Sequence, residues 1–353
     1  MEVLQWARTH GCQWDDITCS EAALGGHLAV LQWARAENCP WTENTCAMAA
    51  RGGHLAVLQW ARAQGCDWDY DTCNEAARGG HLAVLQWARA QGCPWDGWTC
   101  AVAAGGGHME VLQWARAHGC PWDAQTCVWA ARHGQLAVLQ WARSQGCSWN
   151  PWICGEAAQN GHLAVVQWAR AQGGPWNEAT CAEAAGGGHL EVLQWVRAQG
   201  CPWDENTCSE AARGGHLAVL QWARAQNCPW SFGDCVGQVR MTYCGEETLA
   251  LLGWLLSHGP DPAYLLETVA AWDLPERYYT VLWAAQNGWV PEEHFVPLVL
   301  DAEVPWHVTS ELLQCLPRHS QVTPELAVWR TCVLHTLDGY LYPALAGLVT
   351  GFL

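Results

Sequence analysis

The chain repeats the stretch GHLAVLQWARAQGCPWD, which runs from Gly80 to Asp96, and this repetition indicates the fold. Near-copies begin at Gly26, Gly53, Gly107, Gly161, Gly188 and Gly215. The tryptophan of its QW pair recurs every 27 residues from Trp6 to Trp222, and the cysteine of a TC pair recurs at the same interval from Cys19 to Cys235. A fixed period of this length is typical of proteins that stack one small structural unit.

The residues at the ends of each segment predict two helices per unit. Asp, Thr, Asn or Ser follows the loop tryptophan in every unit, and these side chains accept hydrogen bonds from free amides at a helix start. A first helix such as ENTCSEAAR follows and ends at a glycine pair such as Gly214 and Gly215. The first glycine of the pair is replaced only by His133 and Asn160, so we expect a left-handed residue at that position.

The second helix of each unit, such as HLAVLQWARAQ, is amphipathic. Leu217, Val219, Leu220 and Trp222 fall on one side and Arg224 falls on the other. A unit of two short helices cannot bury this apolar side alone, but stacked units can. The sequence therefore predicts an all-α solenoid of stacked two-helix repeats. We expect the QW tryptophans to fill the space between helix layers and the loop tryptophans to seal the seams between units.

The unit TCSEAARGGHLAVLQWARAQGCPWD resembles the ankyrin repeat in its Thr, its AA pair, its GH between the helices and its closing glycine. Ankyrin repeats run about 33 residues, and the residues missing here are those that build the β-hairpin finger. The resemblance therefore implies an ankyrin-like solenoid with shortened fingers and a concave binding face. Tryptophan-rich repeats of this kind are similar to the ankyrin-like families of giant viruses and some protists.

The period also predicts how the chain is organised. Nine 27-residue repeats extend over residues 1–239, and the first is only a half unit, because the chain opens with a second helix. Residues 240–353 lose the strict period but keep a similar spacing of tryptophan and glycine. We expect this part to contain divergent helical repeats that form a C-terminal cap.

Composition excludes several classes of partner. The chain has 353 residues, 34 acids against 17 cations, a net charge of -17 and no lysine. This balance argues against nucleic acid and anionic membranes as partners. The first residues lack the features of a secretory signal, and the last apolar run is too short to span a bilayer. We therefore expect an intracellular monomer, cytoplasmic or in the host cytoplasm if the origin is viral.

Twenty cysteines and fifteen histidines suggest a metal site, but their spacing does not support one. The pattern Cys66, Cys73, His81 lacks the close ligand pairs of structural zinc sites, and Gly174 and Gln135 interrupt it in other units. Disulfides between equivalent cysteines of stacked units are excluded by distance. We expect buried apolar thiols, histidines that bridge the glycine turn by hydrogen bonding, and no cofactor.

No catalytic motif is apparent. The GGGH segments at Gly105 and Gly186 follow helices rather than strands, so they are not phosphate-binding loops. We therefore expect no enzymatic activity.

Differences between the repeats indicate where binding takes place. Variation concentrates at the start of the first helix, which in an ankyrin-like stack borders the concave face. The residues predicted to bind a protein partner are Tyr70, Trp98, Trp129, Trp152, Glu43, Asn44 and Gln125. Each extra tryptophan could instead pack over its neighbour's loop. Gln32 and Arg35 recur in phase at expected solvent positions and receive little functional weight. The resulting hypothesis is a protein-binding scaffold, and the alternative is a thiol-rich metal-binding or architectural repeat protein.

Overall fold

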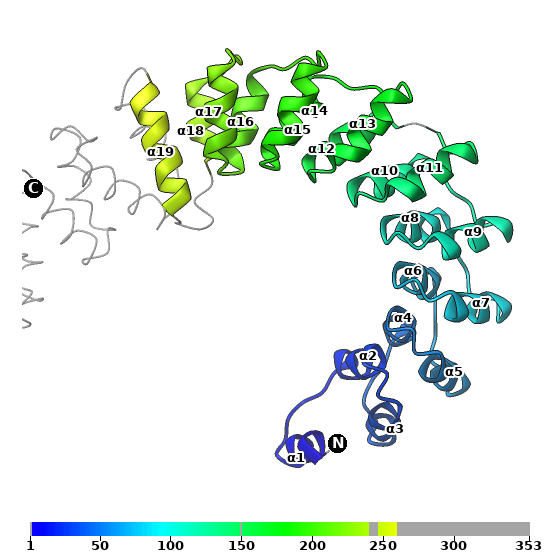
Figure 1. The fold of residues 1–353 in the computed structure, drawn as a ribbon. Coiled ribbons are helices and arrows are strands. Elements are labelled where there is room, and N and C mark those ends of the chain that lie inside the picture. The colour runs from blue at the N-terminus through cyan, green and yellow to red at the C-terminus, as the bar shows by residue number, and fades with distance from the viewer. Residues whose placement is uncertain (1, 149, 240–245, 260–353) are drawn as a thin grey trace, which may run out of the picture. The chain divides into compact units, whose positions relative to one another are not determined.

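The computed structural model describes residues 2–148, 150–239 and 246–259, and these ranges contain nineteen α-helices and no β-strand. They divide between two compact units, Met1–Pro202 and Trp203–Leu353 (Figure 1). The predicted all-α architecture of stacked two-helix repeats is confirmed for the described residues. The predicted boundary near residue 240 stays a prediction, and the expected cap lies outside the described residues apart from 246–259.

The first unit consists of a single helix and seven helix pairs. Its helices are α1 (Glu2–Thr9), α2 (Asp16–Leu24), α3 (Leu28–Ala36), α4 (Glu43–Arg51), α5 (Leu55–Ala63), α6 (Tyr70–Arg78), α7 (Leu82–Ala90), α8 (Gly97–Gly105), α9 (Met109–Ala117), α10 (Ala124–Arg132), α11 (Leu136–Ser144), α12 (Ile153–Gln159), α13 (Leu163–Ala171), α14 (Glu178–Gly186) and α15 (Leu190–Ala198). Each even-numbered helix packs on the next even-numbered helix and on its own odd-numbered partner. From α4 to α13, the even-numbered helices form the inner row of this unit and the odd-numbered helices the outer row (Figure 1).

The described part of the second unit has the same alternation of first and second helices. It contains α16 (Glu205–Arg213), α17 (Leu217–Ala225), α18 (Phe232–Gln238) and α19 (Glu246–His258). Helix α16 packs on α17 and α18, and α19 contacts both α17 and α18. Trp254 of α19 packs against the loop residue Trp230 with ring centroids 6.1 Å apart.

The core between the two rows is built from small and medium apolar side chains. In α7, Val84, Leu85 and Ala88 are buried, and Cys73 of α6 and the loop residue Cys93 are fully buried beside them. Short alanine-rich helices pack closely, which suits a unit of only 27 residues. The second-helix tryptophans were expected to fill this space, but they do not. Trp87 is only half-buried, because it lies on the outer side of the core against a loop tryptophan.

The helix starts follow the predicted caps. Asp69, Asp96 and Asp204 have extended backbones, and each side chain accepts a hydrogen bond from an amide of the first turn. Such caps satisfy amides that have no partner within the helix. The sequence therefore located these helix starts correctly.

The glycine pair behaves differently from the prediction. The left-handed residue is the second member, such as Gly80 with a φ of 75°, whereas the first member, such as Gly79, is right-handed. His133 and Asn160 replace first members, and neither has a positive φ, so neither needs to tolerate a left-handed backbone. The second member is always glycine because its φ is positive, and at positions such as Gly53 and Gly80 the histidine ring of the next repeat also leaves no room for a Cβ.

This histidine joins consecutive helix pairs. Nε2 of His81 lies 2.9 Å from the carbonyl oxygen of Arg51, at the end of the first helix one repeat earlier. His54, His108 and His162 make the same contact with residues 30 positions before them. A Cβ added to Gly80 would meet the His108 ring at 2.5 Å. The histidine was expected to bridge its own glycine turn, but it fixes the stacking of one repeat on the next.

Candidate protein-binding surface

The predicted binding residues all lie on or just before the first helices of the first unit. Tyr70 and Trp98 belong to the first turns of α6 and α8, and Trp129 lies in the middle of α10. Trp152 precedes α12, which begins at Ile153. Their exposed fractions are 53% for Tyr70, 38% for Trp98 and 59% for Trp152, which are large values for aromatic side chains.

Trp98 and Trp129 are the two members that the structure brings into contact. Their ring centroids lie 4.8 Å apart in an edge-to-face arrangement, which aromatic pairs favour. Trp129 is half-buried and lies over Gly105, where an added Cβ would come within 3.0 Å of its ring. The packing alternative therefore describes Trp129 well, while Trp98 keeps an exposed face. Within the described residues, neither Tyr70 nor Trp152 makes a ring contact with this pair.

Two arginines frame the half-buried ring. The guanidinium carbons of Arg78 and Arg132 lie 6.0 and 5.7 Å from the Trp129 ring centroid. Nε of Arg132 also donates to the Glu156 carboxylate at 2.8 Å, and this hydrogen bond raises the pKa of Arg132 above its ordinary value. The apolar centre thus has cations beside it and a carboxylate one helix further on.

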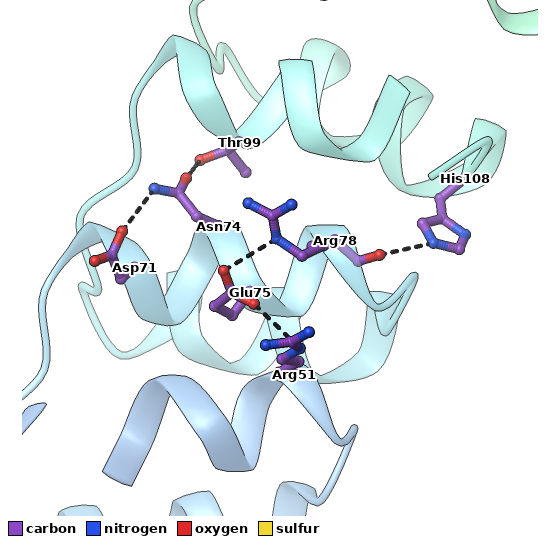
Figure 2. A network of polar contacts seen from close by, with 7 residues as sticks. All are labelled: Arg51, Asp71, Asn74, Glu75, Arg78, Thr99 and His108. Atoms are coloured by element: carbon purple, nitrogen blue, oxygen red, sulfur yellow. Dashed lines mark hydrogen bonds and ion pairs between the residues drawn. The ribbon is translucent and has the colours of Figure 1, made fainter. Parts of the chain in front are cut away.

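A polar network ties this surface to the preceding repeats (Figure 2). Glu75 accepts from Nε of Arg78 at 3.1 Å and pairs with Arg51 at 3.7 Å. The carbonyl of Arg78 in turn contacts Nε2 of His108 at 2.9 Å. Because these bonds connect α4, α6 and the start of α9, they hold Arg78 in place beside Trp129.

A separate set of polar contacts in Figure 2 joins the buried Thr99 and Asn74 to the exposed Asp71. The hydroxyl of Thr99 donates to the Asn74 side chain at 2.7 Å, and that side chain donates to Asp71 at 3.3 Å. These bonds link the starts of α6 and α8, so they fix the register of the helix turns that present Tyr70 and Trp98.

The three polar members of the predicted set are exposed. Asn44 donates to the Ser20 hydroxyl at 3.2 Å, across the contact between α4 and α2. The backbone amide of Gln125 donates to the Asp123 side chain at 2.8 Å, within the cap of α10. Glu43 lies in the first turn of α4, where its negative charge interacts favourably with the positive end of the helix dipole. These residues extend the candidate surface, but they do not converge on one point.

The arginine of the second helix, expected to lie in solvent with little function, makes a structural contact instead. Arg89 donates to the carbonyl of Cys93, and its guanidinium carbon lies 4.1 Å from the centroid of the Trp95 ring. The same contact recurs in most described repeats, with Arg35, Arg62, Arg116, Arg170 and Arg224 over Trp41, Trp68, Trp122, Trp176 and Trp230. The recurrence of an arginine six residues before every loop tryptophan was the available signal.

The loop tryptophans also contact the next second helix. Trp95 lies 5.9 Å from Trp114 between ring centroids, in an edge-to-face arrangement. This geometry matches the expectation that the loop tryptophan seals the seam between neighbouring repeats. Arginine, loop tryptophan and second-helix tryptophan therefore form one stacked group on the outer row, away from the candidate binding surface.

The described residues contain neither a group of metal ligands nor a membrane-spanning helix. No three or more His, Cys, Asp or Glu side chains gather there in a way that could hold a metal ion. None of the helices in that part of the chain combines the length and apolar content needed to cross a bilayer.

Comparison with known proteins gives a limited result. No protein-family model matches the chain, and no curated protein matches it either. Among solved structures, the crystal structure of the human ASB11 ankyrin repeat domain is similar over 44% of this chain and 83% of that one, at 17% identity and a TM-score of 0.36. At this level the likeness identifies neither a family nor a function.

Proposed function

We propose that the chain is a non-enzymatic scaffold that binds a protein partner on the row of first helices in its first unit. The observation that carries this proposal is the exposure of two indoles, Trp98 in the first turn of α8 and Trp152 just before α12, two repeats apart. An exposed tryptophan adds little to stability and much to an interface, where tryptophan is enriched among the residues that dominate binding.

The surroundings suit a protein surface better than a small ligand. The Trp98–Trp129 pair offers an apolar centre, and Arg78, Arg132 and Glu156 offer charges of both signs beside it. Protein interfaces combine an apolar centre with a polar rim in this way. A net charge of -17 disfavours nucleic acid as the partner. We place the scaffold inside the cell, where thiols are reduced as long as the glutathione pool is reduced.

The metal-binding alternative is not supported by a comparable observation. The thiol pair of Cys127 and Cys147 brings two sulfur atoms together, whereas structural zinc sites need four ligands. We therefore retain the scaffold as the proposed function.

The test is affinity purification from the native cell with quantitative mass spectrometry, using three forms of the full chain. These forms are the wild type, the double variant Trp98→Ala/Trp152→Ala and the control Trp6→Ala, which removes another exposed indole outside the candidate surface. Partners that bind at the candidate surface are lost with the double variant and retained with the control. Thermal melts should show similar midpoints for all three forms. Unchanged partners, or a large loss of stability in the double variant, would contradict the proposal.

A further inference from the structure

Buried cysteines lie in contact two by two within the helix pairs. Sγ of Cys127 in α10 donates to Sγ of Cys147, in the loop after α11, at 2.7 Å, and the two side chains are 0% and 2% exposed. Other cysteines 20 residues apart are close enough for one thiol to shift the pKa of the other, namely Cys19 with Cys39, Cys46 with Cys66, Cys73 with Cys93, Cys100 with Cys120 and Cys181 with Cys201.

The antiparallel arrangement of each helix pair explains this contact. The start of the first helix lies beside the end of the second, so the loop that follows the second helix returns to the first helix. The thiol of Cys147 also donates to the carbonyl of Asp123, the cap of α10, at 3.3 Å. Equivalent bonds fix Cys66 on Thr42 and Cys93 on Asp69. Equivalent cysteines of different repeats are too far apart for a disulfide, but Cys127 and Cys147 are not equivalent, because one lies in a first helix and the other in the loop of the same repeat.

The two thiols of a pair differ chemically. The hydrogen bond from Cys127 lowers the pKa of Cys147, and Arg143 acts in the same direction. The pKa of Cys127 is raised by the same hydrogen bond and by burial. In this pair the loop thiol of Cys147 is therefore the better nucleophile, and the helix thiol of Cys127 is the second thiol that disulfide formation needs.

We propose that each of these thiol pairs is a modification site that a small-molecule disulfide such as oxidised glutathione converts into a disulfide within one helix pair. The loop thiolate attacks the glutathione disulfide, forms a mixed disulfide and releases one glutathione thiolate. The helix thiol then loses its proton to solvent and attacks the loop sulfur, releasing the second glutathione thiolate. The chain loses two thiol hydrogens as two electrons reduce one oxidised glutathione to two glutathione molecules.

Geometry permits this step with little movement. A disulfide bond is about 2.05 Å long, so sulfur atoms 2.7 Å apart need only a small change in side-chain rotation. Closure joins the start of the first helix to the end of the second. Because it restricts the unfolded chain, it raises resistance to unfolding repeat by repeat.

Two repeats supply internal controls. Cys154 of α12 is a buried thiol whose position 20 residues later is Gly174, and burial alone is the main cause that raises its pKa to about 11. Cys235 of α18 also lacks a partner thiol at this spacing, because the residue 20 positions later is Leu255. These thiols share the burial of the pairs without the second sulfur 20 residues on.

The experiment maps disulfides in the reduced full chain after exposure to a graded ratio of oxidised to reduced glutathione. One arm uses native buffer and a second uses urea below the unfolding midpoint, where local opening admits the oxidant to buried sulfurs. Remaining thiols are alkylated, the chain is digested without reduction and cross-linked peptides are sequenced. We expect links between cysteines 20 residues apart, each with a mass loss of about 2 Da. Cys154 should remain alkylated or carry glutathione.

Two variants sharpen the result. Cys147→Ser should remove the link at Cys127 and leave the other links unchanged. Gly174→Cys should create a link to Cys154, once the backbone relaxes to relieve a 2.7 Å approach of the new Cβ to the Ala169 carbonyl. The proposal is overturned if the pairs stay free in both arms at ratios that fully modify the exposed Cys12, or if links of other spacings predominate.

Discussion

The guanidinium carbon of Arg89 lies 4.1 Å from the centroid of the Trp95 ring, while the same group donates to the carbonyl of Cys93. One side chain thus closes the end of α7, covers the loop tryptophan and leaves the other ring face to Trp114 of the next repeat. Because this arrangement recurs along the outer row, it is a general device for joining helix pairs.

Replacing this arginine tests the device. Arg89→Lys keeps the charge but loses the planar group that stacks and donates together, so we expect a loss of about 1 kcal/mol of unfolding free energy. Urea denaturation followed by circular dichroism measures the change. Gln86→Ala, an exposed residue of the same helix, is the control and should change stability little. Equal effects of the two substitutions would show that the stacked arginine contributes nothing specific.

The histidine contact between repeats can be gained as well as lost. His81→Ala leaves the carbonyl of Arg51 without its partner and should cost about 1 kcal/mol. In the repeat where glutamine replaces histidine, Gln135→His should add the missing contact and stabilise the chain by a similar amount. Denaturation midpoints of the two variants should therefore move in opposite directions. A destabilised Gln135→His variant would mean that this repeat has adapted to glutamine.

Two left-handed glycines separate backbone strain from packing. Gly80 and Gly92 have φ values of 75° and 82°, but only Gly80 lies under a histidine ring. Gly92→Ala should cost about 1 kcal/mol from strain alone, and Gly80→Ala should cost about 3 kcal/mol because the ring must also move.

Asparagine provides a check on this explanation. Asn38 and Asn227 occupy positions equivalent to Gly92 with φ values of 62° and 60°. Gly92→Asn should therefore be nearly neutral, because asparagine adopts this conformation at lower cost than alanine. Similar losses for Gly80→Ala and Gly92→Ala in chemical denaturation would remove the role assigned to the histidine ring.

Trp98 and Trp129 should respond differently to truncation although they touch. Trp129 is half-buried over Gly105, so Trp129→Ala should destabilise the chain by about 2 kcal/mol. Trp98→Ala removes an exposed ring and one edge-to-face contact, for which we expect about 0.5–1 kcal/mol. Thermal melts of both variants measure this difference. Comparable losses would place Trp98 in the core rather than on a binding surface.

Alkaline pH should weaken the fold through its buried thiols. Burial raises the pKa of Cys154 to about 11 from an ordinary value of 9.0, so the folded chain keeps its proton while the unfolded chain loses it. The stability that this group contributes is complete below pH 9 and is lost as the pH rises towards 11. Each such group lowers the unfolding free energy by about 1.4 kcal/mol per pH unit in this range. Cys154→Ala should reduce the slope by about that amount in denaturation series at pH 9–11, and an unchanged slope would contradict this account.

Much of the candidate surface could be read from the sequence. The variable positions at the starts of the first helices led to Tyr70, Trp98 and Trp152, which are exposed, and the alternative of packing proved to suit Trp129. The recurring arginine was discounted, because a periodic pattern alone does not tell a solvated side chain from one stacked on a ring. The contact between Trp98 and Trp129 joins two repeats, so it depends on how far each helix is offset from the next.

The period, the two helices of each repeat and the residues at which most of these helices begin and end could all be predicted from the amino-acid sequence. These features depend on neighbours within a few positions, such as an Asp69 cap or an apolar stripe, and local interactions suffice to specify them. The contacts between one copy of a repeated residue and another depend on how the helices pack, so they come from the tertiary structure. Cys127 could pair with any nearby thiol in a periodic chain, and the antiparallel packing of α10 on α11 brings Cys147 to it.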